Sequence, residues 1–167
     1  MDDASSQIGA TIERLRDREP WVPWEAYLSA TLRLRVADGW ETLYSTKLGY
    51  RVDFFSARLG MPFGIITGWN PRGRDATERE NRTNDHELHI ALCESGGKIH
   101  RARGSSENGD YFEEGWACSG LSLRYHSVLA ARFRQIAFYW CTASELWCVT
   151  ADLTDWLLVS SLYNQGE

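Results

Sequence analysis

The alternation of hydrophobic and polar positions predicts two strand-forming regions in the first half of the chain. Residues 31–36 alternate apolar and polar side chains in strict period two, Asp38-Gly39 follows, and a second strand-like run covers residues 40–44. This order is typical of a β-hairpin with an Asp-Gly turn. Residues 63–67 form a short apolar run between Pro and Gly, which favours a buried inner strand.

Helical spacing of apolar residues marks both ends of the chain. A first helix is expected before Pro20, which stops it, and another is expected in the C-terminal tail. The positions that carry these expectations are Ile8, Ile12 and Leu15 in the first segment, and Trp156, Val159 and Leu162/Tyr163 in the second.

A long helix is predicted after the inner strand. Asp75 and Glu78 fit a capping box, in which the two side chains satisfy the free backbone N–H groups of a helix start. The helix is expected to continue to Ser95 and to stop at Gly96-Gly97. Its inward stripe includes two amides, Asn81 and Asn84, which need hydrogen-bond partners if they are buried.

A second internal helix is predicted to begin at Ser122, which has the side chain of a good N-cap. Its core-facing residues are expected to be Tyr125, Leu129 and Phe133, because they recur at helical spacing. Residues 48–59 are ambiguous between helix and strand, and a short helix is favoured there.

The predicted order of elements over residues 63–142 is strand, helix, strand, strand, helix, strand. This order is that of the ferredoxin-like split βαβ arrangement, an α+β fold with an antiparallel sheet and both helices on one face. We therefore expect one α+β domain over residues 27–150. A helical arm (residues 1–26) would precede it, and a helical tail (residues 151–167) would pack on it.

Composition and charge exclude several classes of protein. The 167 residues carry a net charge of −5, which argues against broad nucleic-acid binding because phosphate contacts need a concentrated cationic surface. No apolar run reaches the length of a membrane span, and the start, Met1-Asp2-Asp3, lacks the layout of a secretory signal. A cytoplasmic location without membrane contact is expected.

Cysteine and tryptophan contents add two expectations. The four cysteines lie far apart without a Cys-x-x-Cys pair, so they are expected to be reduced core residues. Eight tryptophans are many for this length. Most are expected to fill the core, and some could be exposed for a protein partner.

The strongest candidate site is the corner where the inner strand ends, with Asn70, Arg72, Arg74 and Asn81. Amides, guanidinium groups and the helix dipole could converge there on a phosphate or carboxylate. Two alternatives are that acidic residues at the helix start pair with the arginines, and that Asn81 only fixes the shape of the Asn-Pro turn. Under the ligand hypothesis, the arginines and amides are instead available to a bound ligand.

Other candidates are weaker. Arg132 and Gln135 follow the second helix and could line the same wall, and Glu113 with Glu114 could place a carboxylate near one pocket. His86, His89 and Cys93 share one helix face but lack a fourth metal ligand. No nucleophile and base, phosphate loop or metal set completes a mechanism, so binding is favoured over catalysis and no cofactor is predicted.

Four motifs together resemble the bacterial domain-of-unknown-function family 3293 over most of residues 27–150. They are Ile65-Ile66-Thr67-Gly68-Trp69-Asn70-Pro71; Asn81, Asn84 and Leu88; Gly115-Trp116 with Gly120-Leu121-Ser122; and Arg132-Phe133-Arg134-Gln135-Ile136-Ala137-Phe138-Tyr139-Trp140. The chain departs from the family pattern with Gly68 for Ala, Arg134 for Gly and Ile136 for Asn. The resemblance implies a small soluble bacterial or phage-borne protein and no assigned activity.

Two functions are therefore expected from the sequence. The first is a domain that binds a small anionic or nucleotide-like ligand through Asn70, Arg72, Arg74, Asn81, Arg132 and Gln135. The second is a protein-interaction module, such as an inhibitor, immunity or defence-related factor, that docks a partner through its acidic surface and exposed tryptophans.

Overall fold

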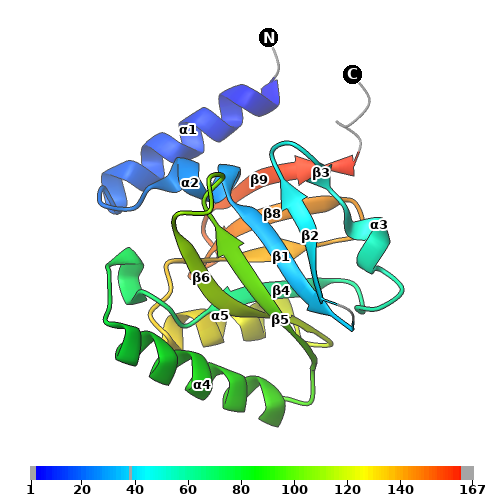
Figure 1. Ribbon diagram of the computed structural model, residues 1–167. Helices are drawn as coiled ribbons and strands as arrows, with labels where there is room; N and C mark the ends of the chain where they lie inside the picture. Colours follow the sequence, from blue (N-terminus) through cyan, green and yellow to red (C-terminus); the bar gives the residue numbers. More distant parts are fainter. Residues whose placement is uncertain (1–2, 38, 163–167) are drawn as a thin grey trace.

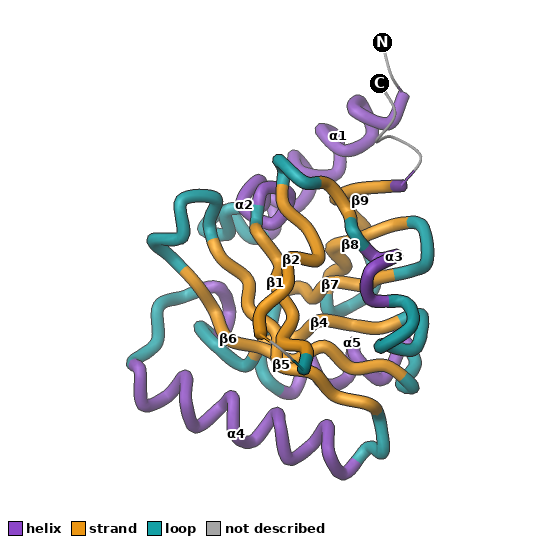
Figure 2. Tube along the Cα trace, turned by 45° about the vertical axis from the view of Figure 1, so that its right-hand side comes forward, coloured by secondary structure: helices purple, strands orange, loops and turns teal. Residues whose placement is uncertain are grey.

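Nine strands form a single antiparallel sheet that curls strongly, with helices at its sides, in a computed structural model that describes residues 3–37 and 39–162 (Figures 1 and 2). The strands are β1 (Thr31–Val36), β2 (Gly39–Ser45), β3 (Gly49–Tyr50), β4 (Phe63–Thr67), β5 (Lys98–Ser105), β6 (Phe112–Ser119), β7 (Ala137–Cys141), β8 (Glu145–Thr150) and β9 (Trp156–Ser161). The helices are α1 (Asp3–Arg18), α2 (Trp24–Ser29), α3 (Val52–Phe55), α4 (Glu78–Glu94), α5 (Leu123–Arg132) and the short 3-10 turn η1 (Pro71–Gly73).

The strand order is β3-β2-β1-β5-β6-β4-β7-β8-β9, and the two end strands, β3 and β9, contact each other. The Tyr50 hydroxyl of β3 donates a hydrogen bond to the Thr142 carbonyl beyond β7, 2.7 Å away. The sheet is therefore nearly closed into a barrel. The ferredoxin-like prediction was wrong for this reason: β4, β5, β6 and β7 are adjacent, but they form only the middle of a much larger curled sheet.

Pairing between distant segments extended the sheet beyond the predicted unit. Strand β1 pairs antiparallel with β5, so that Thr31 lies opposite Ser105, and β8 and β9 continue the sheet on the other side of β7. The predicted hairpin of β1 and β2 forms, although Asp38 of its turn lies outside the described residues. No local sequence pattern reports which strands become neighbours across the sheet.

Alternating side chains of the strands build two separate cores. Ile65 faces the concave interior, where it packs with Leu34, Phe63 and the α3 residue Phe55. The next residue, Ile66, points to the outer face and packs under α4 and α5. This period of two is the expected geometry of a strand that is buried on both faces.

The N-terminal arm docks on the C-terminal strands. Leu15 of α1 and Trp24 of α2 share a third core cluster with Leu157 of β9. Arg18 also pairs with Asp152 (2.7 Å) and with Asp155 (3.1 Å) in the turn between β8 and β9. The arm is thus a helix, as predicted, and it is fixed to the sheet.

The predicted C-terminal helix was wrong, because Trp156–Ser161 forms β9 and pairs antiparallel with β8. The i, i+3 spacing of Trp156 and Val159 indicated a helix, but the segment becomes a strand because it pairs with β8, a contact that local spacing does not report. Leu162 is the last described residue, and Tyr163 lies outside the described part.

Two details of the internal helices also differ from the prediction. The capping box of α4 uses Thr77 and Glu80, two residues later than the predicted pair. Ser122 caps α5 as predicted, but the buried residue in its first turn is His126, whereas Tyr125 is 37% exposed. In the described part of the chain, no helix has the length and apolar composition of a membrane span.

Gly115 tests the tight packing between β4 and β6. A Cβ atom at Gly115 would lie 2.6 Å from the Ile66 backbone oxygen, whereas a Cβ at Gly104 on β5 would meet only the Leu32 side chain at 3.7 Å. We expect Gly115→Ala to lower the free energy of unfolding by about 1–3 kcal/mol, because a strand backbone cannot retreat without losing its ladder. Urea unfolding of both variants measures this, with Gly104→Ala as the control; equal losses would contradict the packing argument.

Candidate functional site

The strand exit is held close to α4. The Thr67 hydroxyl at the end of β4 donates a hydrogen bond to the Glu114 carbonyl (2.6 Å) and accepts one from the Trp69 N–H (3.0 Å). A Cβ atom at Gly68 would lie 2.9 Å from the Asn84 carbonyl oxygen of α4. Gly68 therefore permits the close approach of the helix backbone.

Asn70 is buried (7% exposed) and adopts a left-handed conformation (φ 48°), which asparagine tolerates better than most residues. Its carboxamide oxygen accepts hydrogen bonds from Ala76 N–H (3.0 Å) and Asn81 Nδ2 (3.1 Å), and its Nδ2 donates to the Tyr111 hydroxyl (2.6 Å) and Glu113 Oε1 (3.0 Å). Asn81 Oδ1 in turn accepts from the Asn70 backbone N–H (2.8 Å). Both carboxamides are thus engaged within the protein.

Glu113 is the ionisable member of this hydrogen-bond network. Its Oε1 also accepts a hydrogen bond from the Tyr111 hydroxyl (2.6 Å), and it borders a small cavity of about 70 Å³ next to Tyr27 and Tyr139. Burial raises the pKa of Glu113, while the hydrogen bonds from Tyr111 and Asn70 act in the opposite direction. The carboxyl group therefore keeps its proton to a higher pH than an exposed glutamate does.

Two arginines join the turn to the loop after α5 through their backbones. Arg72 and Arg134 both have positive φ (61° and 56°), and the Arg72 N–H donates a hydrogen bond to the Arg134 carbonyl (2.7 Å). Gln135 adds a second link, because its Nε2 donates to the Trp69 carbonyl (3.0 Å). A left-handed non-glycine residue costs about 1–2 kcal/mol.

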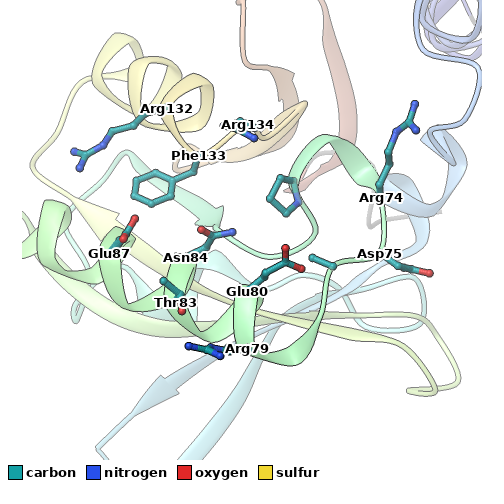
Figure 3. A pocket seen from close by; sticks show the side chains of 12 residues that line it. Arg74, Asp75, Arg79, Glu80, Thr83, Asn84, Glu87, Arg132, Phe133 and Arg134 are labelled. Carbon is teal, nitrogen blue, oxygen red and sulfur yellow. The ribbon is translucent and has the colours of Figure 1, made fainter.

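An open groove of about 610 Å³ lies between the η1 turn, the first half of α4 and the end of α5. Figure 3 shows Phe133 opposite Asn84 of α4 toward one end of the groove, with Arg74 and Asp75 at the other end and further charged side chains along the rim. The lining residues are Pro71, Arg74, Asp75, Ala76, Arg79, Glu80, Thr83, Asn84, Glu87, Arg132, Phe133 and Arg134.

Four of the rim residues are exposed arginines: Arg74, Arg79, Arg132 and Arg134. Arg74 lies over the Trp21 ring (5.1 Å) and Arg132 over the Phe133 ring (5.3 Å). Among the described residues, none of the four guanidinium groups makes a hydrogen bond or ion pair. Their hydrogen-bond donors are therefore available to a bound molecule.

Three carboxylates lie on the rim, and one of them already accepts hydrogen bonds from within the protein. Glu80 accepts hydrogen bonds from the Thr77 backbone N–H (2.8 Å) and hydroxyl (2.9 Å), and these bonds lower its pKa. Asp75 and Glu87 are exposed and have no partner within the described part. The groove thus presents four cations and two unpaired carboxylates.

The structure separates the six predicted site residues into three groups. Arg74 and Arg132 line the groove, whereas Arg72 lies on the other side of the turn. Asn70, Asn81 and Gln135 are engaged in the hydrogen bonds described above, which hold the turn. The alternative pairing of arginines with the helix start is not seen, because Glu78 pairs with Arg82.

Sequence reasoning missed Arg79 and Arg134 as groove residues and Tyr111 as a partner of Asn70. Arg79 follows the predicted cap, on the exposed first turn of α4. An arginine at such a position was visible in the sequence, but the position alone does not identify a groove residue. Glu113 and Glu114 point to different places: Glu114 pairs with Arg103 on the outer sheet face. Both residues lie in β6, which begins at Phe112, and successive residues of a strand point to opposite faces of the sheet.

The predicted His–Cys face of α4 does not gather into a metal site. Within residues 3–37 and 39–162, no cluster of three or more His, Cys, Asp or Glu residues could hold a metal ion. His89 instead stacks on Trp116, with ring centroids 4.1 Å apart. The cysteines are unpaired, and all except Cys93 are buried.

Residues 66–138 match the model of a family described as Protein of unknown function (DUF3293). The resemblance predicted from the sequence is therefore confirmed. The DUF3293 segment runs from β4 to β7, so it contains the η1 turn, α4, Glu113 and the loop after α5, while the N-terminal arm lies outside it. Searches of curated proteins and of solved structures found no match.

Asn81→Ala tests the internal role of the buried amides. The substitution removes two hydrogen bonds and leaves the Asn70 N–H without its acceptor, so we expect the free energy of unfolding to fall by about 2–3 kcal/mol. Asn84→Ala is the control, since the Asn84 side chain makes no hydrogen bond within the described part. Thermal and urea unfolding compare the two variants; a loss below about 0.5 kcal/mol for Asn81→Ala would contradict the network.

Glu113 predicts a pH dependence of stability with a defined sign. Its pKa is raised in the folded chain, so above its ordinary value near 4.5 the folded protein retains a proton that the unfolded chain releases. Stability contributed by this group is thus lost as the pH rises through the folded pKa. Glu113→Gln keeps the acceptor oxygen and removes the titration, so the variant should gain stability relative to the native protein as the pH rises.

Urea unfolding at about pH 4, 5.5 and 7 measures the difference between the native protein and Glu113→Gln. Glu87→Gln controls for the removal of one negative charge, because Glu87 is exposed and unpartnered in the described part. A difference that moves in favour of the native protein as the pH rises would show that the sign is wrong.

Proposed function

We propose that the protein binds a small anionic ligand in the groove between η1, α4 and α5. The observation that carries the proposal is the set of four arginines around one groove whose guanidinium groups make no hydrogen bond or ion pair within the described residues, in a chain whose net charge is −5. Arginine donors suit phosphate and carboxylate groups, because the planar guanidinium can bind two oxygens at once. The N-terminal end of α4 adds a favourable dipole.

The fixed walls of the groove support this function. The hydrogen bonds of Asn70 hold the turn, and the backbone link between Arg72 and Arg134 holds the loop after α5. A ligand therefore meets rigid walls and needs to order only the arginine side chains. The unpaired carboxylates Asp75 and Glu87 could accept hydrogen bonds from hydroxyl groups of a ligand that carries them beside its anionic group.

The alternative, a protein-interaction module that uses exposed tryptophans, has less support. Of the eight tryptophans, only Trp21 (44%) and Trp156 (37%) belong to the exposed large hydrophobic residues. Trp21 is moreover engaged with the η1 turn, because its Nε1 donates a hydrogen bond to the Arg72 carbonyl (2.8 Å). A protein partner remains one outcome of the test below.

The double variant Arg79→Ala and Arg134→Gly tests the proposal with little risk to folding. Alanine suits the exposed helix position of Arg79, and glycine suits the left-handed backbone at Arg134. We expect the native protein to bind pyrophosphate at low ionic strength and the variant to bind it about tenfold more weakly, a loss of about 1.4 kcal/mol. Isothermal titration calorimetry measures both affinities.

Arg124→Ala is the matched control, because it removes an exposed arginine from the first turn of α5, away from the groove. An equal loss in this control, unchanged affinity in the double variant, or absence of pyrophosphate binding by the native protein would reject the groove. If, in addition, a stoichiometric protein partner is recovered with the native chain, the interaction module becomes the better interpretation.

A further inference from the structure

A second hollow of about 420 Å³ lies on the other side of the η1 turn. Apolar side chains from three separate segments form much of its wall, unlike the charged rim of the groove. The lining residues are Leu15, Arg18, Glu19, Trp21, Trp24, Arg72, Ala131, Arg134, Gln135, Ile136, Thr150, Ala151 and Asp152. Such a hollow suits a flat apolar group better than a free anion.

Trp21 is an exposed ring that is already held in place. Its Nε1 donates a hydrogen bond to the Arg72 carbonyl (2.8 Å), and the Arg74 guanidinium lies 5.1 Å from its ring centroid. The preceding helix is anchored by the ion pair of Arg18 with Asp152 (2.7 Å). An aromatic side chain that is fixed before binding loses little freedom when a ligand ring stacks on it.

The hollow and the arginine groove adjoin at the turn. Arg134 lines both, and Arg74 lines the groove while its guanidinium lies over Trp21 of the hollow. Arg72 borders the hollow, and its guanidinium makes no hydrogen bond or ion pair in the described part of the chain. One molecule with an aromatic end and an anionic end could therefore occupy both spaces.

We propose that this hollow holds the aromatic ring of the ligand, so that the ligand class is an aromatic phosphate of the nucleoside phosphate type. The inference rests on the proposed function, since the phosphate groups occupy the arginine groove. Trp21 stacks on the ring, and Arg72 and Arg134 lie between the two ends of the molecule. Trp21 lies outside the segment that matches the family model, so the match does not cover the ring on which the ligand stacks.

Adenosine diphosphate, pyrophosphate and adenosine are the probes, titrated by calorimetry at one low ionic strength. We expect adenosine diphosphate to bind about tenfold more tightly than pyrophosphate, because stacking of one base on an aromatic ring contributes a factor of this order or more. Trp21→Leu should weaken adenosine diphosphate binding about tenfold and leave pyrophosphate binding unchanged. Quenching of tryptophan fluorescence by adenosine diphosphate should decrease in this variant.

Two further variants separate stacking from support of the turn. Trp21→Phe keeps a ring but removes the hydrogen bond to the Arg72 carbonyl, and it should retain most of the affinity for adenosine diphosphate. Trp156→Leu removes the other exposed tryptophan and should change neither affinity. If Phe and Leu at position 21 weaken binding alike, or if Trp156→Leu has the same effect, stacking on Trp21 is wrong.

The outcomes also distinguish this inference from the proposed function. Pyrophosphate binding without any gain for adenosine diphosphate would overturn the aromatic subsite and keep the anion groove. If adenosine binds in a Trp21-dependent way and pyrophosphate does not bind, the hollow is a ring-binding site but the groove is not an anion site. That result would also reject an aromatic phosphate as the ligand class. Absence of binding by all three probes would reject both.

Discussion

The hydrogen bonds of the Asn70 carboxamide are the interaction on which the strand exit depends. This one buried side chain joins three elements: the segment before α4 through Ala76, α4 itself through Asn81, and β6 through Glu113. Because a buried amide without partners is costly, the turn cannot move without breaking several of these bonds together. The groove therefore has a fixed wall, while its arginines are exposed and their guanidinium groups make no hydrogen bond or ion pair in the described part of the chain.

The curl of the sheet places the N-terminal arm beside this turn. Closure brings β9 and the docked α1 to the side of the sheet where β4 ends, and the segment after α1 then places Trp21 on the Arg72 carbonyl (Figure 1). A flat four-stranded sheet would have left the turn without this cover. The DUF3293 segment supplies the turn, α4 and α5, and the arm supplies the aromatic ring beside them. The two adjoining cavities thus arise from parts of the chain that are far apart in sequence.

Much of the local structure could be predicted because it depends on neighbouring residues. Short-range patterns and helix caps indicate the inner strand β4, the Asn-Pro turn, and the helices α4 and α5. The candidate corner was located for the same reason. The chemistry of this corner was only partly predicted. The position of Asn81 in the sequence is the same whether its side chain binds a ligand or accepts a hydrogen bond from a backbone N–H. Only its distance to Asn70 distinguishes the two.

The sequence by itself therefore determined where β1, β2, β4 and the α4 and α5 helices lie, the family resemblance, and the location of the arginine-rich turn, since each of these follows from local patterns and motifs. The tertiary structure alone decided the nearly closed sheet, the strand β9 in place of a helix, and the meeting of Trp21, Arg72 and Arg134. The physical reason is that strand pairing and burial are set by contacts between residues distant in sequence. An alternating or helical pattern shows which face of an element is apolar, but not which partner will cover it.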